Sequence, residues 1–207
     1  AVPTHRRDTF ASPARAQAWF EWRRQGWSLP AWVAILLPFE LALLWLARDA
    51  PGLVLEILLV VFCTPPLLAM FASATVSQSS PHARDASGVA PFIGTRPLPS
   101  AALIAAKLEM AAWSTLAAWV PVLVAVPLAL KWSGTWPMVA ARAIRTVELF
   151  GAPRAIVLLL LALLALMAAT WKQLVQGLYV SLTGRAWVIR SSAFLALTFL
   201  LVIGPVA

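Results

Sequence analysis

Charged residues, cysteine and histidine are all scarce in this chain. Only 12% of its residues are charged and 61% are apolar, whereas soluble domains have about 25% charged and about 45–50% apolar residues. The charges gather between long apolar runs, so the composition predicts a membrane protein. The net charge of +8 does not indicate nucleic-acid binding, because the Arg and Lys residues flank hydrophobic runs, where such side chains reach lipid phosphates.

The lone cysteine and the two histidines exclude several kinds of site. Cys63 lies inside a hydrophobic run, so neither a disulfide within the chain nor a cysteine zinc site is available. His5 and His82 lie in polar sequence, and the chain has no phosphate-binding loop, HExxH or GxSxG motif. We therefore predict no catalytic or metal-binding residues, no enzymatic activity and no directly bound cofactor.

Five hydrophobic runs predict an all-α, polytopic membrane fold with short interfacial helices. Runs of this length suit bilayer-crossing helices, which need about 17–25 residues. The predicted spans are residues 29–47, 53–71, 101–130, 155–172 and 186–206. We divide the chain into a cytosolic or interfacial segment, residues 1–28, and a transmembrane domain, residues 29–207, whose segment 73–99 is a cytosolic loop.

The middle span has a well-defined start. Pro97 and Pro99 keep the backbone extended, and Ser100 is suited to cap the helix that follows. A helix of about 30 residues is roughly 45 Å long, which exceeds the about 30 Å hydrocarbon core. Its first turns should therefore lie outside the hydrocarbon, with Lys107 near the headgroups and Trp113 just inside.

Two stretches have the pattern of helices that lie in the headgroup layer. SPARAQAWFEWRRQGW begins at Ser12 with a capping residue and a proline and ends near a glycine, and MVAARAIRTVELF begins at Met138. The first is interpreted either as an elbow that anchors the first span or as a helix that also docks a partner. The predicted interfacial anchors are Trp19, Trp22, Arg23, Arg24, Arg96 and Lys107.

Acidic residues at membrane depth are candidate functional residues, because a carboxylate there is costly. Glu40 lies near the middle of the first span, which we expect Pro38 and Glu40 to interrupt, and Glu56 lies one turn inside the second span. For Glu40 a structural role and a transport role remain open. A lipid-modifying or intramembrane enzyme would require Glu40, Glu56 or Glu109 to converge with a base or a metal.

The distribution of basic residues predicts the orientation. The N-terminal segment and the loops on its side of the membrane carry more Arg and Lys than the opposite loops. Since basic residues favour the cytoplasmic side, we expect a multi-pass protein of the inner, cytoplasmic membrane with its N-terminus in the cytoplasm.

The chain resembles the membrane subunit, or permease, of bacterial ATP-binding-cassette (ABC) transporters of the type-2 exporter class. The likeness rests on AQAWFEWRRQGWSLP from residue 16, GTRPLPSAALIAAKLEMAAWSTLAAW from residue 94 and WKQLVQGLYVSLTGRAWV from residue 171. The resemblance implies six spans per unit, an interfacial N-terminal helix and a cytosolic loop that meets the ATPase. Because the sequence has only five such runs, we expect a fragment of a longer chain.

The resemblance also implies the partners. ATP would bind to a separate ABC ATPase subunit, and the permease would act as a dimer or with a second half of a longer chain, surrounded by membrane lipid and without nucleic acid. Arg84 and Asp85 are the candidate contacts to the ATPase, although a solvated loop pair is an equal alternative. Transport would proceed by alternating access of an unidentified substrate. The alternative function is that of a membrane scaffold or assembly protein that transports nothing.

Overall fold

A computed structural model describes residues 13–76 and 100–183, which form helices joined by short turns. Within these two ranges there is no β-strand. The elements are α1 (Pro13–Glu21), the π-helix η1 (Trp22–Gly26), α2 (Ser28–Leu46), α3 (Pro51–Val76), α5 (Ser100–Trp132), α6 (Trp136–Phe150) and α7 (Ala152–Thr183). The predicted fold class, an all-α helical membrane protein, is confirmed.

Four segments of the described chain are long and apolar enough to cross a membrane. They are Arg15–Leu46, Pro51–Ser73, Ile104–Trp132 and Ala152–Gln176. Each overlaps one of the first four predicted spans, and the second and fourth contain theirs completely. All four exceed the about 20 residues that a bilayer requires. The fifth predicted span, residues 186–206, lies outside the described residues, as does most of the predicted loop 73–99.

Two helix ends and one expected interruption differ from the sequence prediction. The helix α3 continues to Val76 and α7 continues to Thr183, so both extend beyond their predicted spans. The expected interruption at Pro38 is wrong, because α2 runs through this residue without a break in helical structure. A proline removes only one backbone hydrogen bond from a helix, and membrane-spanning helices tolerate this loss where neighbouring groups satisfy the freed carbonyl.

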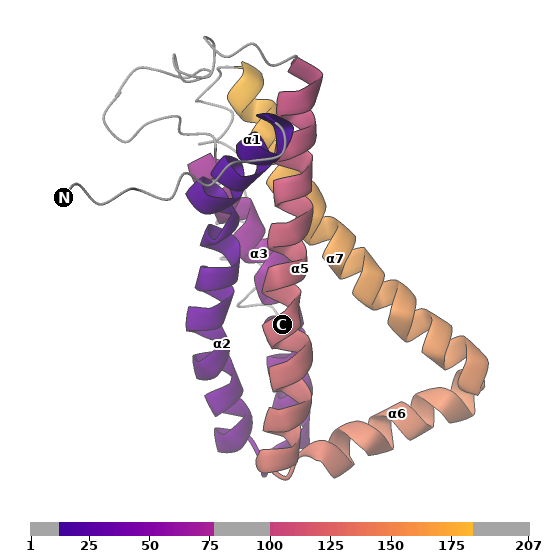
Figure 1. The fold of residues 1–207 in the computed structure, drawn as a ribbon. Helices are drawn as coiled ribbons and strands as arrows, with labels where there is room; N and C mark the ends of the chain where they lie inside the picture. The colour runs from indigo at the N-terminus through magenta and orange to yellow at the C-terminus, as the bar shows by residue number, and fades with distance from the viewer. Residues whose placement is uncertain (1–12, 77–99, 184–207) are drawn as a thin grey trace, which may run out of the picture.

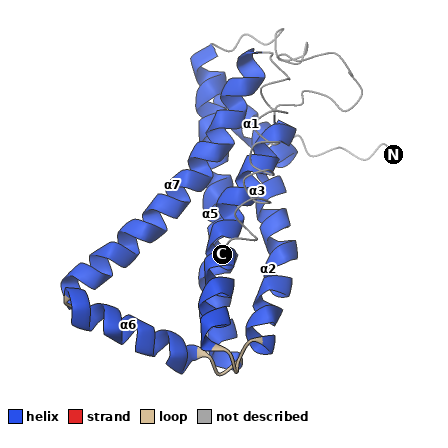
Figure 2. Ribbon diagram, turned by 180° about the vertical axis from the view of Figure 1, so that it is seen from behind, coloured by secondary structure: helices blue, strands red, loops and turns tan. Residues whose placement is uncertain are grey.

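Helices α2, α3 and α5 form an upright bundle, and α5, α6 and α7 make the three sides of a triangular frame (Figure 1). Helices α2, α3 and α5 stand side by side, and α1 lies across one end of them (Figure 1). The C-terminal half of α7 packs on α3 and α5, while its N-terminal half diverges from the bundle (Figures 1 and 2). At the opposite end α6 joins α5 to α7. We call the two ends of the bundle the α1 end and the α6 end.

Two glycines make the sharp turns of this frame. Gly134 lies between α5 and α6 with φ of 73°, and Gly151 lies between α6 and α7 with φ of 80°. Residues with a Cβ atom rarely adopt such angles, whereas glycine does so without steric cost. The predicted interfacial helix beginning at Met138 is thus a separate helix, α6, and its residues 141–150 are all exposed.

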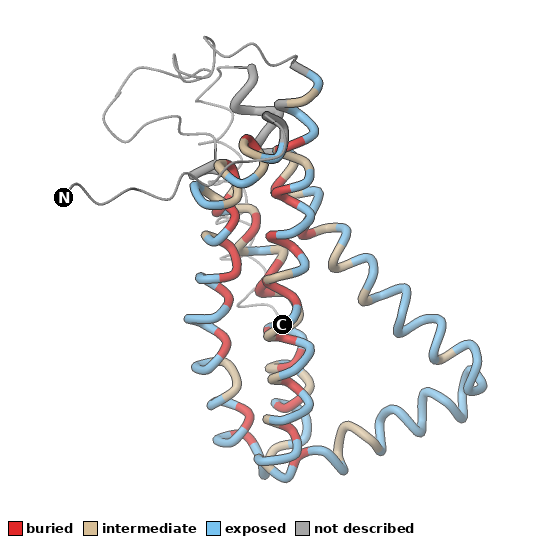
Figure 3. Tube along the Cα trace, in the orientation of Figure 1, coloured by how far each residue is buried: buried red, intermediate tan, exposed pale blue. Residues whose placement is uncertain are grey.

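The core of the bundle consists of one buried face from each upright helix. On α2 this face includes Leu29, Val33 and Leu37, which are spaced four residues apart and therefore share one side of the helix. The buried stripes of α2, α3 and α5 face one another, whereas most of α6 and the diverging half of α7 are exposed (Figure 3). In a membrane, exposed apolar helix faces of this kind contact lipid.

Candidate functional site

The most connected polar cluster lies at the α1 end, where α1 meets the start of α5. Glu21 is only 1% exposed. Its Oε1 atom accepts a hydrogen bond of 2.9 Å from Nε2 of Gln17, and its Oε2 atom accepts one of 3.3 Å from Nζ of Lys107. Gln17 and Glu21 are four residues apart and so lie on the same face of α1. Both carboxylate oxygens therefore have a partner.

This cluster is suited to holding α1 against α5. A buried carboxylate is tolerated when a cation and further hydrogen bonds compensate for its lost hydration, and Lys107 and Gln17 provide both. The side chain of Lys107 is 28% exposed and that of Glu21 is 2% exposed. Solvent therefore reaches the ion pair through Lys107 and not through Glu21. Sequence analysis placed Lys107 among the lipid anchors, but the structure gives it a protein partner.

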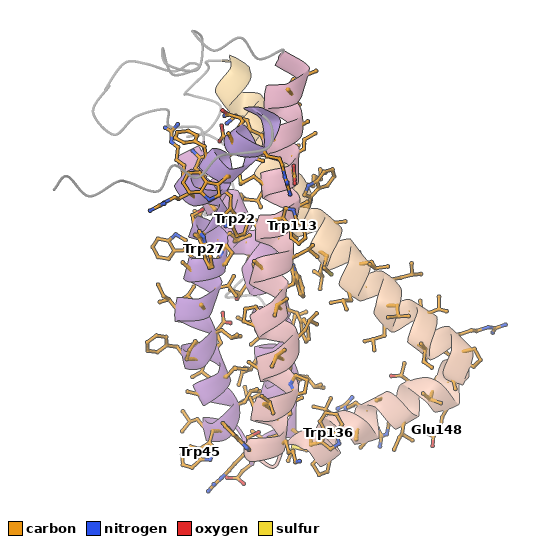
Figure 4. The ribbon with its side chains drawn as sticks, viewed as in Figure 1. Trp22, Trp27, Trp45, Trp113, Trp136 and Glu148 are labelled. Carbon is orange, nitrogen blue, oxygen red and sulfur yellow. The ribbon has the colours of Figure 1, made fainter. Side chains whose placement is uncertain are left out.

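The other predicted anchors of the N-terminal segment lie beside this cluster. The guanidinium of Arg23 lies 5.3 Å from the centre of the Trp19 ring, and Trp22 packs against Trp27 with ring centres 5.6 Å apart. Trp19, Arg23 and Arg24 are exposed. Trp22 and Trp27 lie near the α1 end, whereas Trp45 and Trp136 lie near the α6 end (Figure 4). Tryptophans at both ends are typical of the two headgroup layers of a membrane.

A second polar contact joins α2 to α3 within the spans. The hydroxyl of Thr64 donates a hydrogen bond to Oε1 of Glu40 and also lies 3.0 Å from the backbone carbonyl of Val60. A hydroxyl has a single hydrogen to donate, so these two oxygens compete for it. The Oε2 atom of Glu40 is buried and has no hydrogen-bond partner among the described residues. The carboxylate of Glu40 is thus bonded to α3 through one oxygen, while its other oxygen lacks a hydrogen-bond partner among the described residues.

The acidic residues at membrane depth are not gathered into one site. Glu56 and Glu109 are exposed, and no hydrogen bond or ion pair joins either to Glu40 in residues 13–76 and 100–183. No group of three His, Cys, Asp or Glu side chains that could hold a metal ion occurs in the described part of the chain. The geometry therefore supplies attachment points between helices rather than a set of reacting groups.

A third contact, which the sequence analysis did not single out, lies where α3, α5 and α7 meet. Trp119 is 1% exposed, and its indole Nε1 donates a hydrogen bond of 3.1 Å to Oγ1 of Thr170. Its ring also stacks on Phe62 with ring centres 6.3 Å apart. Trp119 of α5 therefore contacts both α3 and α7 where the C-terminal half of α7 packs on the bundle.

Comparison with known proteins does not assign this chain to a family. Neither protein-family models, nor curated proteins, nor solved structures gave a significant match. The candidate ATPase contacts, Arg84 and Asp85, and the predicted anchor Arg96 lie outside the described residues.

The sequence carried only a partial signal for the residues that the prediction missed. Gln17 and Glu21 have the spacing of an i, i+4 pair, and Glu21 is an acidic residue in a segment otherwise rich in Arg and Trp. That pattern was sufficient to mark Glu21. Nothing in the local sequence pairs it with Lys107, which is 86 positions away.

Proposed function

We propose that this chain is the membrane-spanning permease subunit of an ATP-driven transporter of the ABC type, coupled to a separate ATPase subunit. The observation that best supports the proposal is the buried contact of Glu21 with Lys107 and Gln17. It connects the interfacial segment directly to α5, one of the central spans. A helix attached in this way transmits a displacement at the membrane surface into the bundle.

The proposed mechanism is alternating access. ATP binding closes the ATPase subunits, which displace the loop that follows α3, and the spans repack to open the other side of the membrane. In this scheme Arg84 and Asp85 contact the ATPase. Only 6% of the most apolar stretch of α7 is buried, compared with 28–39% in the other three candidate spans. This uneven packing supports a bundle in which one span changes its position relative to the rest.

The test is co-purification with an ATPase. The tagged chain would be expressed in its native membrane and isolated in mild detergent, and ATP hydrolysis would be measured in the isolated material. Arg84→Ala with Asp85→Ala should remove the ATPase activity. The matched control, Arg142→Ala with Glu148→Ala on α6, removes the same two charges at the α6 end and should retain it.

The alternative, a scaffold that transports nothing, predicts a different result. It is favoured by the observation that the polar contacts of Glu21, Glu40 and Trp119 all join one helix to another. A scaffold would yield no ATPase activity in any of several detergents, with the wild-type chain or with either double variant. That result would contradict the permease proposal.

A further inference from the structure

An apolar groove lies between α2 and α5 toward the α6 end, apart from the polar contacts described above. It has a volume of about 330 Å³, and nearly all of its surface is apolar. Its lining includes Ala42 and Trp45 from α2, and Ala125, Ala129 and Trp132 from α5. The alanines have short side chains, so the two helices leave a space here that leucines would fill.

The location of the groove limits what can occupy it. Both helices that form it are candidate membrane spans, so in a membrane the groove lies at the depth of the hydrocarbon layer, where acyl chains are abundant. If a methylene group takes about the volume of a water molecule, about 30 Å³, the space holds roughly ten of them.

The end of the groove is suited to a phosphate. Trp45 and Trp132 mark the headgroup level, and the guanidinium of Arg48 lies 5.2 Å from the centre of the Trp45 ring. Arg48 contacts Asp49 through Nε at 3.6 Å, and both side chains are exposed, so its terminal amino groups remain available. Lys131 adjoins Trp132 and is also exposed, which adds a second cation at this end.

We propose that this groove binds one phospholipid with an anionic headgroup, whose acyl chain lies between α2 and α5 and whose phosphate is bound by Arg48. The apolar lining selects an acyl chain, and the cations select a negatively charged headgroup. Such a lipid would fill the space that the alanines leave and tie the two helices together at the α6 end. The proposal does not depend on the transport function proposed above.

The binding test uses native mass spectrometry of the full chain in detergent. The probes are phosphatidylglycerol and phosphatidylcholine with identical acyl chains, and the readout is the fraction of protein that retains one lipid after collisional activation. The wild-type chain should retain phosphatidylglycerol in preference to phosphatidylcholine. Ala129→Leu and Ala125→Leu, which fill the groove, should lose the retained lipid. Ala162→Leu, at an exposed position of α7, should behave like the wild type.

A surface variant tests the headgroup contact separately. Arg48→Gln should reduce the preference for phosphatidylglycerol about fivefold, the effect of one cation near an anionic surface, while an acyl chain is still bound. Each variant is first shown to melt within a few degrees of the wild type by circular dichroism.

Three results would overturn the proposal. In the first, both leucine variants retain lipid as the wild type does. In the second, Arg48→Gln leaves the lipid preference unchanged, which removes the assigned phosphate contact. In the third, the leucine variants convert a dimer into a monomer, which assigns the groove to a second copy of the chain instead.

Discussion

Lys107 holds Glu21 through an ion pair of 3.3 Å that joins the start of α5 to the end of α1. The two residues are 86 positions apart in the sequence, and the carboxylate is almost completely withdrawn from solvent. Helix α1 is therefore a packed part of the bundle, in addition to any contact that it makes with lipid headgroups.

Removal of Lys107 should destabilise the protein strongly. Lys107→Met leaves the carboxylate of Glu21 buried without its cation, and losing one partner of a buried pair costs about 3 kcal/mol. Glu21→Gln should cost less, because the amide can still bond to Gln17 and Lys107 can reach the surface. Thermal melting in detergent would measure both. Lys172→Met, at an exposed position of α7, is the control and should stay within about 0.5 kcal/mol of the wild type.

The hydrogen bond between Thr64 and Glu40 should contribute modestly to stability. Side-chain hydrogen bonds within membrane bundles average about 0.6 kcal/mol in double-mutant cycles. A cycle of Thr64→Val, Glu40→Leu and the double variant, followed by denaturant unfolding, should give a coupling energy near this value. A coupling of zero would mean that the contact does not hold α2 to α3. Glu40→Gln should be nearly neutral, since its amide can donate to Thr64 while Thr64 donates to the Val60 carbonyl.

The attachment of α7 should depend on Thr170. Thr170→Val leaves the buried indole N–H of Trp119 without an acceptor, which costs about 1–3 kcal/mol. Thr115 provides a matched control, because it is also buried but donates to the carbonyl of Ala111 in its own helix. Thr115→Val should therefore change the melting temperature little. Equal losses in the two variants would argue against a specific role for the contact of Trp119 with Thr170.

Gly26 should be intolerant of a larger residue because of Trp22. A Cβ atom at Gly26 would lie 2.4 Å from the Trp22 ring, so Gly26→Ala must displace this ring from its place beside Trp27. Such overpacking costs about 1–3 kcal/mol. The loss should disappear when Trp22 is already changed to Ala. Gly52→Ala adds a Cβ atom with no neighbour within 4 Å, so it should not lower the melting temperature.

The helices themselves were largely predictable from the sequence, for identifiable reasons. Long apolar runs bounded by charge or proline placed α2, α3, α5 and α7, and the alternation of Arg with apolar residues indicated α6. Glu40 could be singled out from the sequence because it lies deep in an apolar run, and whether its role is structural or in transport stays open. Its bond to Thr64 was not predictable, since it depends on how two helices are rotated and shifted against each other.

The divergence of α7 from the bundle also could not be predicted from the sequence. Leu and Ala surround the N-terminal half of α7 on every side, so hydrophobic periodicity cannot say which face packs against protein and which faces lipid. The helix begins after the turn at Gly151, and its C-terminal half packs on α3 and α5, where Trp119 bonds to Thr170. Glycines occur in many kinds of turn, and a Trp–Thr bond leaves no mark in the local pattern.

Because α7 is tilted away from the bundle, the thickness of the bilayer should affect the shape of the molecule. The candidate span of α7 has 25 residues and is therefore about 37 Å long. A helix that is longer than the thickness of the hydrocarbon layer accommodates the excess by tilting. A thin bilayer therefore spreads α7 farther from α5, and a thick bilayer brings it more upright. The same chain would thus have different outlines in membranes of different lipid composition.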